Sequence, residues 1–131
     1  MDNRKNSGKP DKLQWHLAFY DAIRLELFEN LDDIEIIYEH QLTSEPMRID
    51  LLIVKKRKDV IINKNIARIF RGHNIIEYKS PDDYFSARDF QQVLAYANHY
   101  AANTPGVDDA DLSLTFVGNR HPRTLLQYLT E

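Results

Sequence analysis

The stretch that decides the fold is Asn74-Ile75-Ile76-Glu77-Tyr78-Lys79-Ser80. Its β-branched and aromatic residues favour a strand, and the apolar setting predicts that this strand is buried. Successive side chains of a strand point to opposite faces, so Glu77 and Lys79 are expected to emerge side by side. The stretch therefore predicts an acid and a lysine on one face of a buried strand.

A second apolar stretch, Arg48-Ile49-Asp50-Leu51-Leu52-Ile53-Val54, lies upstream and carries one acid. Its apolar residues occupy both alternating positions, which is typical of a central strand covered on both faces. A charge inside such a strand must be paired, bound to a metal or neutralised. Asp50 is therefore difficult to explain as an ordinary surface residue.

The rest of the chain divides into segments with clear local preferences. Apolar residues at helical spacing, without an intervening Gly or Pro, predict a helix from about residue 12 to 30. Turn residues at 43–46 separate the apolar stretch 34–41 from the strand around Asp50 and predict a hairpin. Further along, the sequence predicts a short helix over 64–71 capped by Asn63 and ended by Gly72, a helix that starts at Ser86 and ends near 103–106, a strand over 112–118 and a helix from residue 124.

This order of elements predicts an α/β fold with a central mixed sheet of about four strands flanked by helices. With 131 residues the chain is long enough for one domain with its own core. We expect that domain to span residues 12–131, after a polar and disordered tail at residues 1–11. The last predicted helix has barely begun at Glu131, which leaves open that the domain is part of a longer protein.

Composition excludes several classes of protein. The chain has no cysteine, which removes a disulfide framework, a thiol nucleophile and a cysteine-based zinc site. Its five histidines show no metal-ligand spacing, and its four scattered glycines do not form a phosphate-binding loop. No apolar run is long enough for a signal peptide or a membrane span, so we expect a cytoplasmic protein with no membrane partner.

The net charge of -3 conceals a strong segregation of charge. Basic residues crowd the segment between the two acid-bearing strands, with Lys55-Lys56-Arg57-Lys58 followed by Lys64, Arg68 and Arg71. A solvated loop with a charged helix explains this pattern as well as a surface that contacts phosphates. The sequence leaves both interpretations open.

The three charged residues of the two strands suit the hydrolysis of a phosphodiester. That reaction requires neutralisation of the phosphate, a nucleophilic hydroxide and a stabilised leaving oxygen, and Mg²⁺ held by carboxylates serves all three needs. We expect Asp50 and Glu77 to bind Mg²⁺, with Mn²⁺ as a substitute, the carbonyl of Tyr78 to be a further ligand, and Lys79 to activate water. The alternative is an internal ion pair, which two acids and one lysine satisfy poorly because an excess negative charge remains.

These residues, in this order, resemble the PD-(D/E)xK nuclease superfamily, with Asp50 in one apolar strand and Glu77-x-Lys79 in the next. Gln92-Val93-Leu94-Ala95-Tyr96 in the following helix resembles the Gln-x-x-x-Tyr motif of RecB-type members. The stretch 48–100 is similar to a group of bacterial proteins described as transposase-like nucleases. Over about residues 12–118 the resemblance implies a restriction-endonuclease-like core.

The resemblance also implies roles for residues that the pattern alone assigns differently. Gln92 and Tyr96 would position substrate or the groups that surround the metal ligands, although spacing alone places them on a polar helix face beside an apolar stripe that includes Val93 and Leu94. Glu26, which spacing alone leaves as a solvated acid, would be a further metal ligand. The implied activity is that of a Mg²⁺-dependent endonuclease or exonuclease acting on DNA. The resemblance also leaves open a homodimer, in which two copies would cut the two strands of a duplex. Two alternatives stay open: an inactive domain of the same fold that binds nucleic acid or protein, and an enzyme that acts on RNA.

Overall fold

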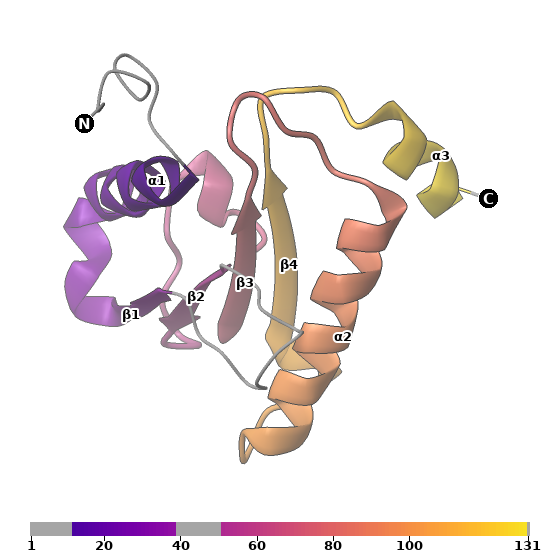
Figure 1. Cartoon of the computed structure of the whole chain (residues 1–131). Coiled ribbons are helices and arrows are strands. Elements are labelled where there is room, and N and C mark those ends of the chain that lie inside the picture. The colour runs from indigo at the N-terminus through magenta and orange to yellow at the C-terminus, as the bar shows by residue number, and fades with distance from the viewer. Residues whose placement is uncertain (1–11, 39–50, 131) are drawn as a thin grey trace, which may run out of the picture.

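The computed structural model describes residues 12–38 and 51–130 of the chain. Asp50 and the predicted tail lie outside these residues. The helices and strands are α1 (Lys12–Glu26), the 3-10 helix η2 (Phe28–Asp33), β1 (Ile34–Tyr38), β2 (Leu51–Lys56), the 3-10 helix η3 (Asn65–Ala67), β3 (His73–Tyr78), α2 (Ala87–Asn103), the 3-10 helix η4 (Asp109–Asp111), β4 (Leu112–Val117) and α3 (Arg123–Thr130) (Figure 1).

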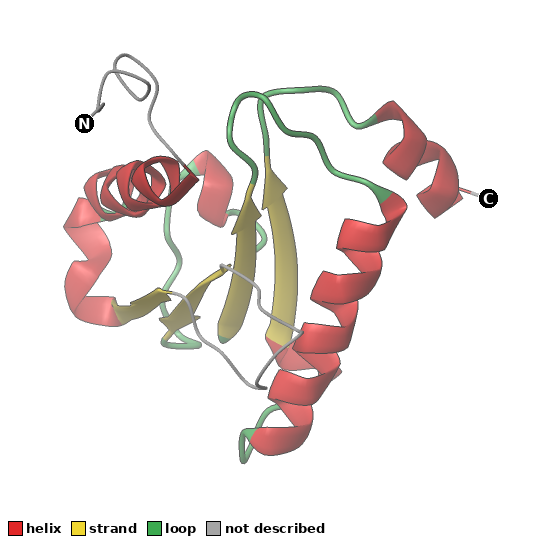
Figure 2. Cartoon of the chain, viewed as in Figure 1, coloured by secondary structure: helices red, strands yellow, loops and turns green. Residues whose placement is uncertain are grey.

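The four strands form one mixed sheet in the order β1-β2-β3-β4. β1 and β2 pair antiparallel, as do β2 and β3, whereas β3 and β4 run parallel and are connected through α2. A parallel pair needs such a long crossover because its strands cannot be joined by a tight hairpin. The predicted α/β fold with a four-stranded mixed sheet flanked by helices is confirmed (Figure 2).

Helices cover both faces of this sheet (Figure 1). On the α1 face, Ile23 and Leu27 pack with residues of the central strands and of the segment between them, and this α1-face cluster consists of Ile23, Leu27, Leu52, Val54, Ile62, Ala67, Phe70 and Ile76. On the opposite face, four residues of α2 pack with three residues of the same strands, and this α2-face cluster consists of Leu51, Ile53, Ile75, Val93, Tyr96, Ala97 and Tyr100. Because alternate residues of β2 and β3 enter different clusters, both strands are central, as their apolar sequences predict.

The start and end of α2 follow the predicted capping chemistry. Ser86 is the N-cap residue, and its hydroxyl accepts a hydrogen bond from the backbone N–H of Asp89, while the Asp89 side chain accepts one from the backbone of Ser86. This reciprocal arrangement satisfies two donors that the first turn of a helix leaves without partners. After Asn103 the chain turns through Gly106, whose φ of 81° is a left-handed conformation that glycine adopts without steric cost.

The predicted helix over 64–71 is wrong. Of that segment only Asn65–Ala67 is helical, as a single 3-10 turn, and its N-cap position is Lys64 rather than Asn63. The segment lies in an irregular connection between β2 and β3 that buries Ile62, Ala67 and Phe70 in the α1-face cluster. The burial of these three side chains in the core outweighs the weak helical preference of a short charged segment.

Two further features differ from the sequence prediction, the end of α1 and the buried face of α2. α1 ends at Glu26 and the chain continues as the 3-10 helix η2, so the predicted helix to residue 30 is four residues too long. On α2 the buried stripe runs through Val93, Tyr96, Ala97 and Tyr100, whereas Leu94 is 38% exposed. The apolar face is therefore rotated towards the tyrosines.

Within the described residues, no helix is both long and apolar enough to cross a lipid bilayer.

Candidate functional site

The carboxyl end of β3 brings Glu77 and Lys79 to the same face of the sheet. Ile75, two residues before Glu77, is fully buried in the α2-face cluster. Glu77 pairs in register with Leu51 of β2 and Phe116 of β4, and both of these residues pack with that cluster. Lys79 follows at the same alternation and reaches a residue of α2. Both charged side chains therefore lie on the α2 face.

Lys79 is held by a partly buried ion pair. Its Nζ lies 3.1 Å from Oδ1 of Asp89, and the two side chains are 17% and 18% exposed. The backbone N–H of Lys79 donates to the carbonyl of Val117 at 2.9 Å, which extends the pairing of β3 with β4 by one residue. Its ammonium group also lies 5.8 Å from the centre of the Phe85 ring. The lysine consequently has a defined position beyond the end of the strand.

Asp89 joins the lysine to the start of α2. One of its oxygens, Oδ2, accepts hydrogen bonds from the backbone N–H and the hydroxyl of Ser86, each at 2.9 Å, while Oδ1 accepts from Lys79. Burial alone would raise the pKa of this carboxyl group, but the hydrogen bonds from Ser86 and Lys79 outweigh it and lower the pKa. The carboxylate is therefore ionised at neutral pH. Sequence reasoning identified the helix cap and missed this partner of Lys79, although a Ser-x-x-Asp capping pattern is a signal that an acid lies there.

Asp89 should make stability depend on acid pH. Because its pKa is lower in the folded than in the unfolded chain, its contribution to the free energy of unfolding is complete above the unfolded pKa of about 4 and is lost as the pH falls through the folded value. We expect Asp89→Asn to lose less stability than the wild type between about pH 5 and pH 2. Urea unfolding followed by circular dichroism at several pH values measures this. Asp21→Asn, at an exposed position of α1, should keep the wild-type dependence, and equal slopes for all three proteins would contradict the expectation.

Gly118 allows the aromatic ring of Phe85 to pack close to Lys79. A Cβ atom at Gly118 would lie 3.0 Å from Cε2 of Phe85 and 3.9 Å from Cβ of Lys79. Phe85 is 3% exposed and also packs on Phe116 with ring centres 5.1 Å apart. The absence of a side chain at Gly118 therefore permits the close packing that flanks the lysine.

Tyr78 divides its side chain and its backbone between two roles. Its ring stacks on Phe19 of α1 with centres 4.6 Å apart and meets the His16 ring edge-on at 5.7 Å. Burial on this face raises the pKa of its hydroxyl. The side chain thus belongs to the α1 face, opposite Glu77 and Lys79, and only the backbone carbonyl remains a candidate metal ligand.

The other predicted site residues lie in different environments. Gln92 is exposed on α2, whereas Tyr96 is 3% exposed and forms part of the α2-face cluster. Burial, with a smaller effect of Tyr100, raises the pKa of Tyr96, so its hydroxyl stays protonated at neutral pH. Glu26 is exposed at the end of α1, on the opposite side of the sheet from α2. Asp50 lies outside the described residues.

A bound metal ion needs several donor side chains close together. In residues 12–38 and 51–130, no three side chains of the types His, Asp and Glu are grouped so that they would hold a metal ion. Of the two strand carboxylates that the sequence predicts as metal ligands, Glu77 lies within the described residues and Asp50 lies outside them. Comparisons of the chain with protein-family models, with curated proteins and with solved structures find no match.

Proposed function

We propose that this protein is a metal-dependent nuclease that hydrolyses phosphodiester bonds in DNA. The observation that supports the proposal is the position of Glu77 and Lys79, which lie on one sheet face at the carboxyl end of β3. Asp50 precedes Leu51 directly in the sequence, and Leu51 is the residue of β2 that pairs with Glu77. Asp50 and Glu77 would supply the two carboxylates for Mg²⁺ only if the chain leaves the alternation of β2 at Asp50, because Leu51 and Glu77 already share the α2 face. The choice of DNA rests on the resemblance to PD-(D/E)xK nucleases.

The electrostatics of the site suit this reaction. Mg²⁺, when bound, would offset the negative charge of the phosphate and favour the deprotonation of a water molecule. Lys79 carries three N–H donors, and in the structure Asp89 accepts from one of them. With Mg²⁺ and substrate bound, its other donors would orient water or donate to a phosphate oxygen as charge develops. Asp89 would act as a positioning residue because it sets the direction in which Lys79 extends.

The structure changes how the remaining predicted residues enter the proposal. Gln92 lies three residues after Asp89 on α2, which makes the two side chains neighbours on the helix surface, and its exposure leaves it available to substrate. Tyr96 is buried, so we assign it to packing of α2 on the sheet rather than to substrate contact. Glu26 is left as an exposed acid of α1, without a part in the reaction.

A second candidate is a domain of the same fold that binds nucleic acid or protein without cleaving it. The observation that favours it is the ion pair of Lys79 with Asp89, because a lysine that joins β3 to α2 has a structural use of its own. In that case the pair holds the start of α2 against the sheet. The two candidates differ in whether a divalent metal binds near Glu77.

Metal dependence tests the proposal directly. We expect the purified protein to cleave linear, circular or branched DNA when Mg²⁺ or Mn²⁺ is added and to stop when EDTA removes the metal. Mg²⁺ at ten times its dissociation constant should also raise the free energy of unfolding by about 1.4 kcal/mol, because it binds only the folded chain. Gel assays measure the cleavage, and thermal unfolding with and without metal measures the stabilisation.

The variants that test metal binding, and their matched control, each replace a carboxylate with an amide of nearly the same shape. Asp50→Asn and Glu77→Gln should abolish both cleavage and stabilisation by metal, whereas Glu29→Gln, at an exposed acid of η2, should preserve both. Absence of cleavage together with unchanged unfolding temperatures in either metal would overturn the nuclease proposal and favour the binding domain. Equal cleavage by the wild type and both site variants would assign the activity to another site or to a contaminant.

A further inference from the structure

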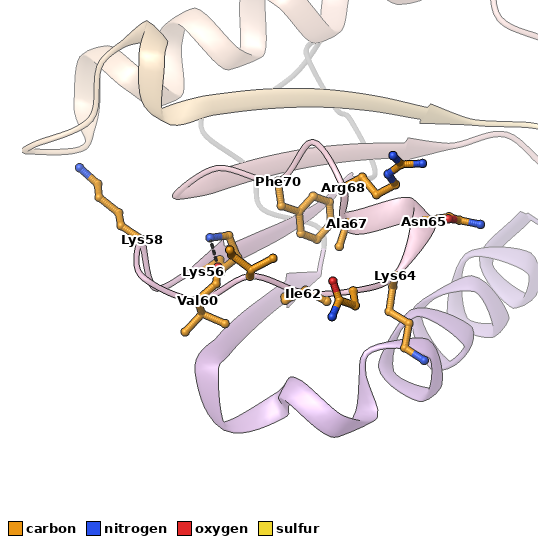
Figure 3. A pocket seen from close by; sticks show the side chains of 11 residues that line it. Lys56, Lys58, Val60, Ile62, Lys64, Asn65, Ala67, Arg68 and Phe70 are labelled. Atoms are coloured by element: carbon orange, nitrogen blue, oxygen red, sulfur yellow. Dashed lines mark hydrogen bonds between the residues drawn. The ribbon is translucent and has the colours of Figure 1, made fainter.

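A cavity of about 610 Å³ lies in the irregular connection between β2 and β3. Its lining residues come from the end of β2, from η3 and from the connection on both sides of η3 (Figure 3). Ile62, Ala67 and Phe70 anchor the connection in the α1-face cluster. The cavity therefore lies on the sheet face opposite Glu77 and Lys79, and it is separate from the proposed catalytic site.

Both basic and apolar side chains line this cavity. Of the described residues that line it, four are basic, none is acidic and two are asparagines; the basic residues are Lys56, Lys58, Lys64 and Arg68. The apolar part includes Val60 and Phe70, together with Ile61, which is 84% exposed at the surface. A chain with a net charge of -3 thus concentrates positive charge beside exposed apolar surface. That combination favours an anionic ligand that also has an apolar part.

The basic groups differ in how far they are already occupied. Lys56 donates to the carbonyls of Arg57 and Val60 at 3.0 and 2.7 Å, and Lys58 pairs with Asp111 at 3.2 Å. For Lys64 and Arg68, no ion pair with a carboxylate is found in the described part of the chain. These two residues are therefore the cations with the most capacity for an external anion.

The arrangement of the cations selects the kind of anion. Figure 3 shows Lys58 at one end of the cavity, Lys64 and Arg68 towards the other end, and Lys56 between them. The charged groups do not converge on one point, as they would around a single phosphate. A single-stranded nucleic acid presents a row of phosphate charges along its backbone, and its bases offer apolar faces. Charges spread along an apolar surface match such a chain.

We propose that this cavity is a binding surface for a single-stranded nucleic acid, with Lys64 and Arg68 contacting its phosphates. Ile61 and Val60, which are less buried than Phe70, provide apolar surface for the bases. The surface operates without metal and lies apart from Glu77 and Lys79, so its binding does not depend on the proposed cleavage reaction. It would hold nucleic acid on the domain whether or not the chain cleaves it.

Binding of a labelled single-stranded DNA of about 12 nucleotides, measured by fluorescence anisotropy in EDTA, tests this surface. Lys64→Glu/Arg68→Glu should lower the magnitude of the slope of log affinity against log salt by about 1.4, at about 0.7 for each lost phosphate contact. Relative to the wild type, that change in slope corresponds to an additional loss of affinity of about 25-fold on going from 1 M to 0.1 M salt. Inorganic pyrophosphate and polyglutamate should compete weakly, because neither combines spaced phosphates with bases.

The matched control is Arg24→Glu/Arg123→Glu, which changes the net charge equally at two exposed positions on α1 and α3. It should bind DNA more tightly than the cavity variant, with a slope close to that of the wild type. Lys64→Gln/Arg68→Gln serves if charge reversal prevents folding, which circular dichroism detects. Equal losses in the cavity and control variants, absence of DNA binding by the wild type, or competition by polyglutamate as strong as by DNA would each overturn the proposal.

Discussion

Lys79→Ala is expected to lower the rate of DNA cleavage about 100-fold or more in the presence of Mg²⁺. The loss should fall on kcat rather than on KM, because the ammonium group would interact most strongly with charge that develops in the transition state. Lys79→Arg should recover part of the rate, since it keeps the charge but presents a planar group in place of a compact one. Steady-state kinetics on a labelled DNA measures both constants.

A structural role for Lys79 predicts a different outcome, and stability measurements separate the two. Loss of the Lys79 ion pair leaves Asp89 with its hydrogen bonds from Ser86, so we expect the free energy of unfolding to fall by about 1 kcal/mol. Lys55→Ala is the control. It removes a lysine of β2 whose Nζ lies 4.0 Å from Oε1 of Glu35, and it should leave cleavage unchanged. Wild-type kcat in a folded Lys79→Ala protein would remove Lys79 from the proposed mechanism.

The strands were the most predictable part of this fold. The apolar runs that end at Val54 and Ile76 occupy both faces of their strands, and both faces are buried in the structure. The hairpin of β1 with β2 and the cap of α2 at Ser86 also followed from local chemistry. These features depend on residues close together in the sequence, where alternation and capping operate.

The connection between β2 and β3 could not be predicted in the same way. Its conformation depends on where Ile62, Ala67 and Phe70 meet the distant residues of α1 and the sheet. A pattern of charged residues with a final glycine suggests a helix, but that pattern contains no information on the shape of the surface to be covered. The cavity with Lys64 and Arg68 results from this irregular path and was predictable only as a cluster of basic residues.

The candidate site was predictable in one strand and less so in the helix that follows. Alternation along β3 was sufficient to place Glu77 and Lys79 on one face. The burial of Tyr96 depends on the rotation of α2 about its axis, which its contacts with Ile53 and Ile75 determine. Spacing alone does not determine that rotation. Tyrosine packs well both in a core and at a surface, so the tyrosines and alanines of α2 do not mark its buried face.

Asn74→Leu is expected to lower the free energy of unfolding by about 3–5 kcal/mol, the largest loss of stability among the substitutions considered. The Asn74 side chain is fully buried, and its amide group donates to the carbonyls of Val54 at 3.0 Å and Arg71 at 2.8 Å. Its oxygen accepts from the backbone N–H of Arg71 at 2.6 Å and the hydroxyl of Ser113 at 2.5 Å. Leucine has a similar volume and would leave these buried partners without hydrogen bonds.

Asn74 therefore connects three parts of the molecule that are distant in sequence: β2, the end of the irregular connection and β4. Because leucine fills the space, the loss reports the hydrogen bonds rather than a cavity, and thermal unfolding should show a decrease of about 10–15 °C in the midpoint. Asn98→Leu makes the same chemical change at an exposed position of α2 and should shift the midpoint little. If the two variants unfold at the same temperature, Asn74 does not hold the connection to the sheet. A smaller loss for Ser113→Ala, which removes one of the four partners, would show that the bonds to the backbone carry most of the stabilisation.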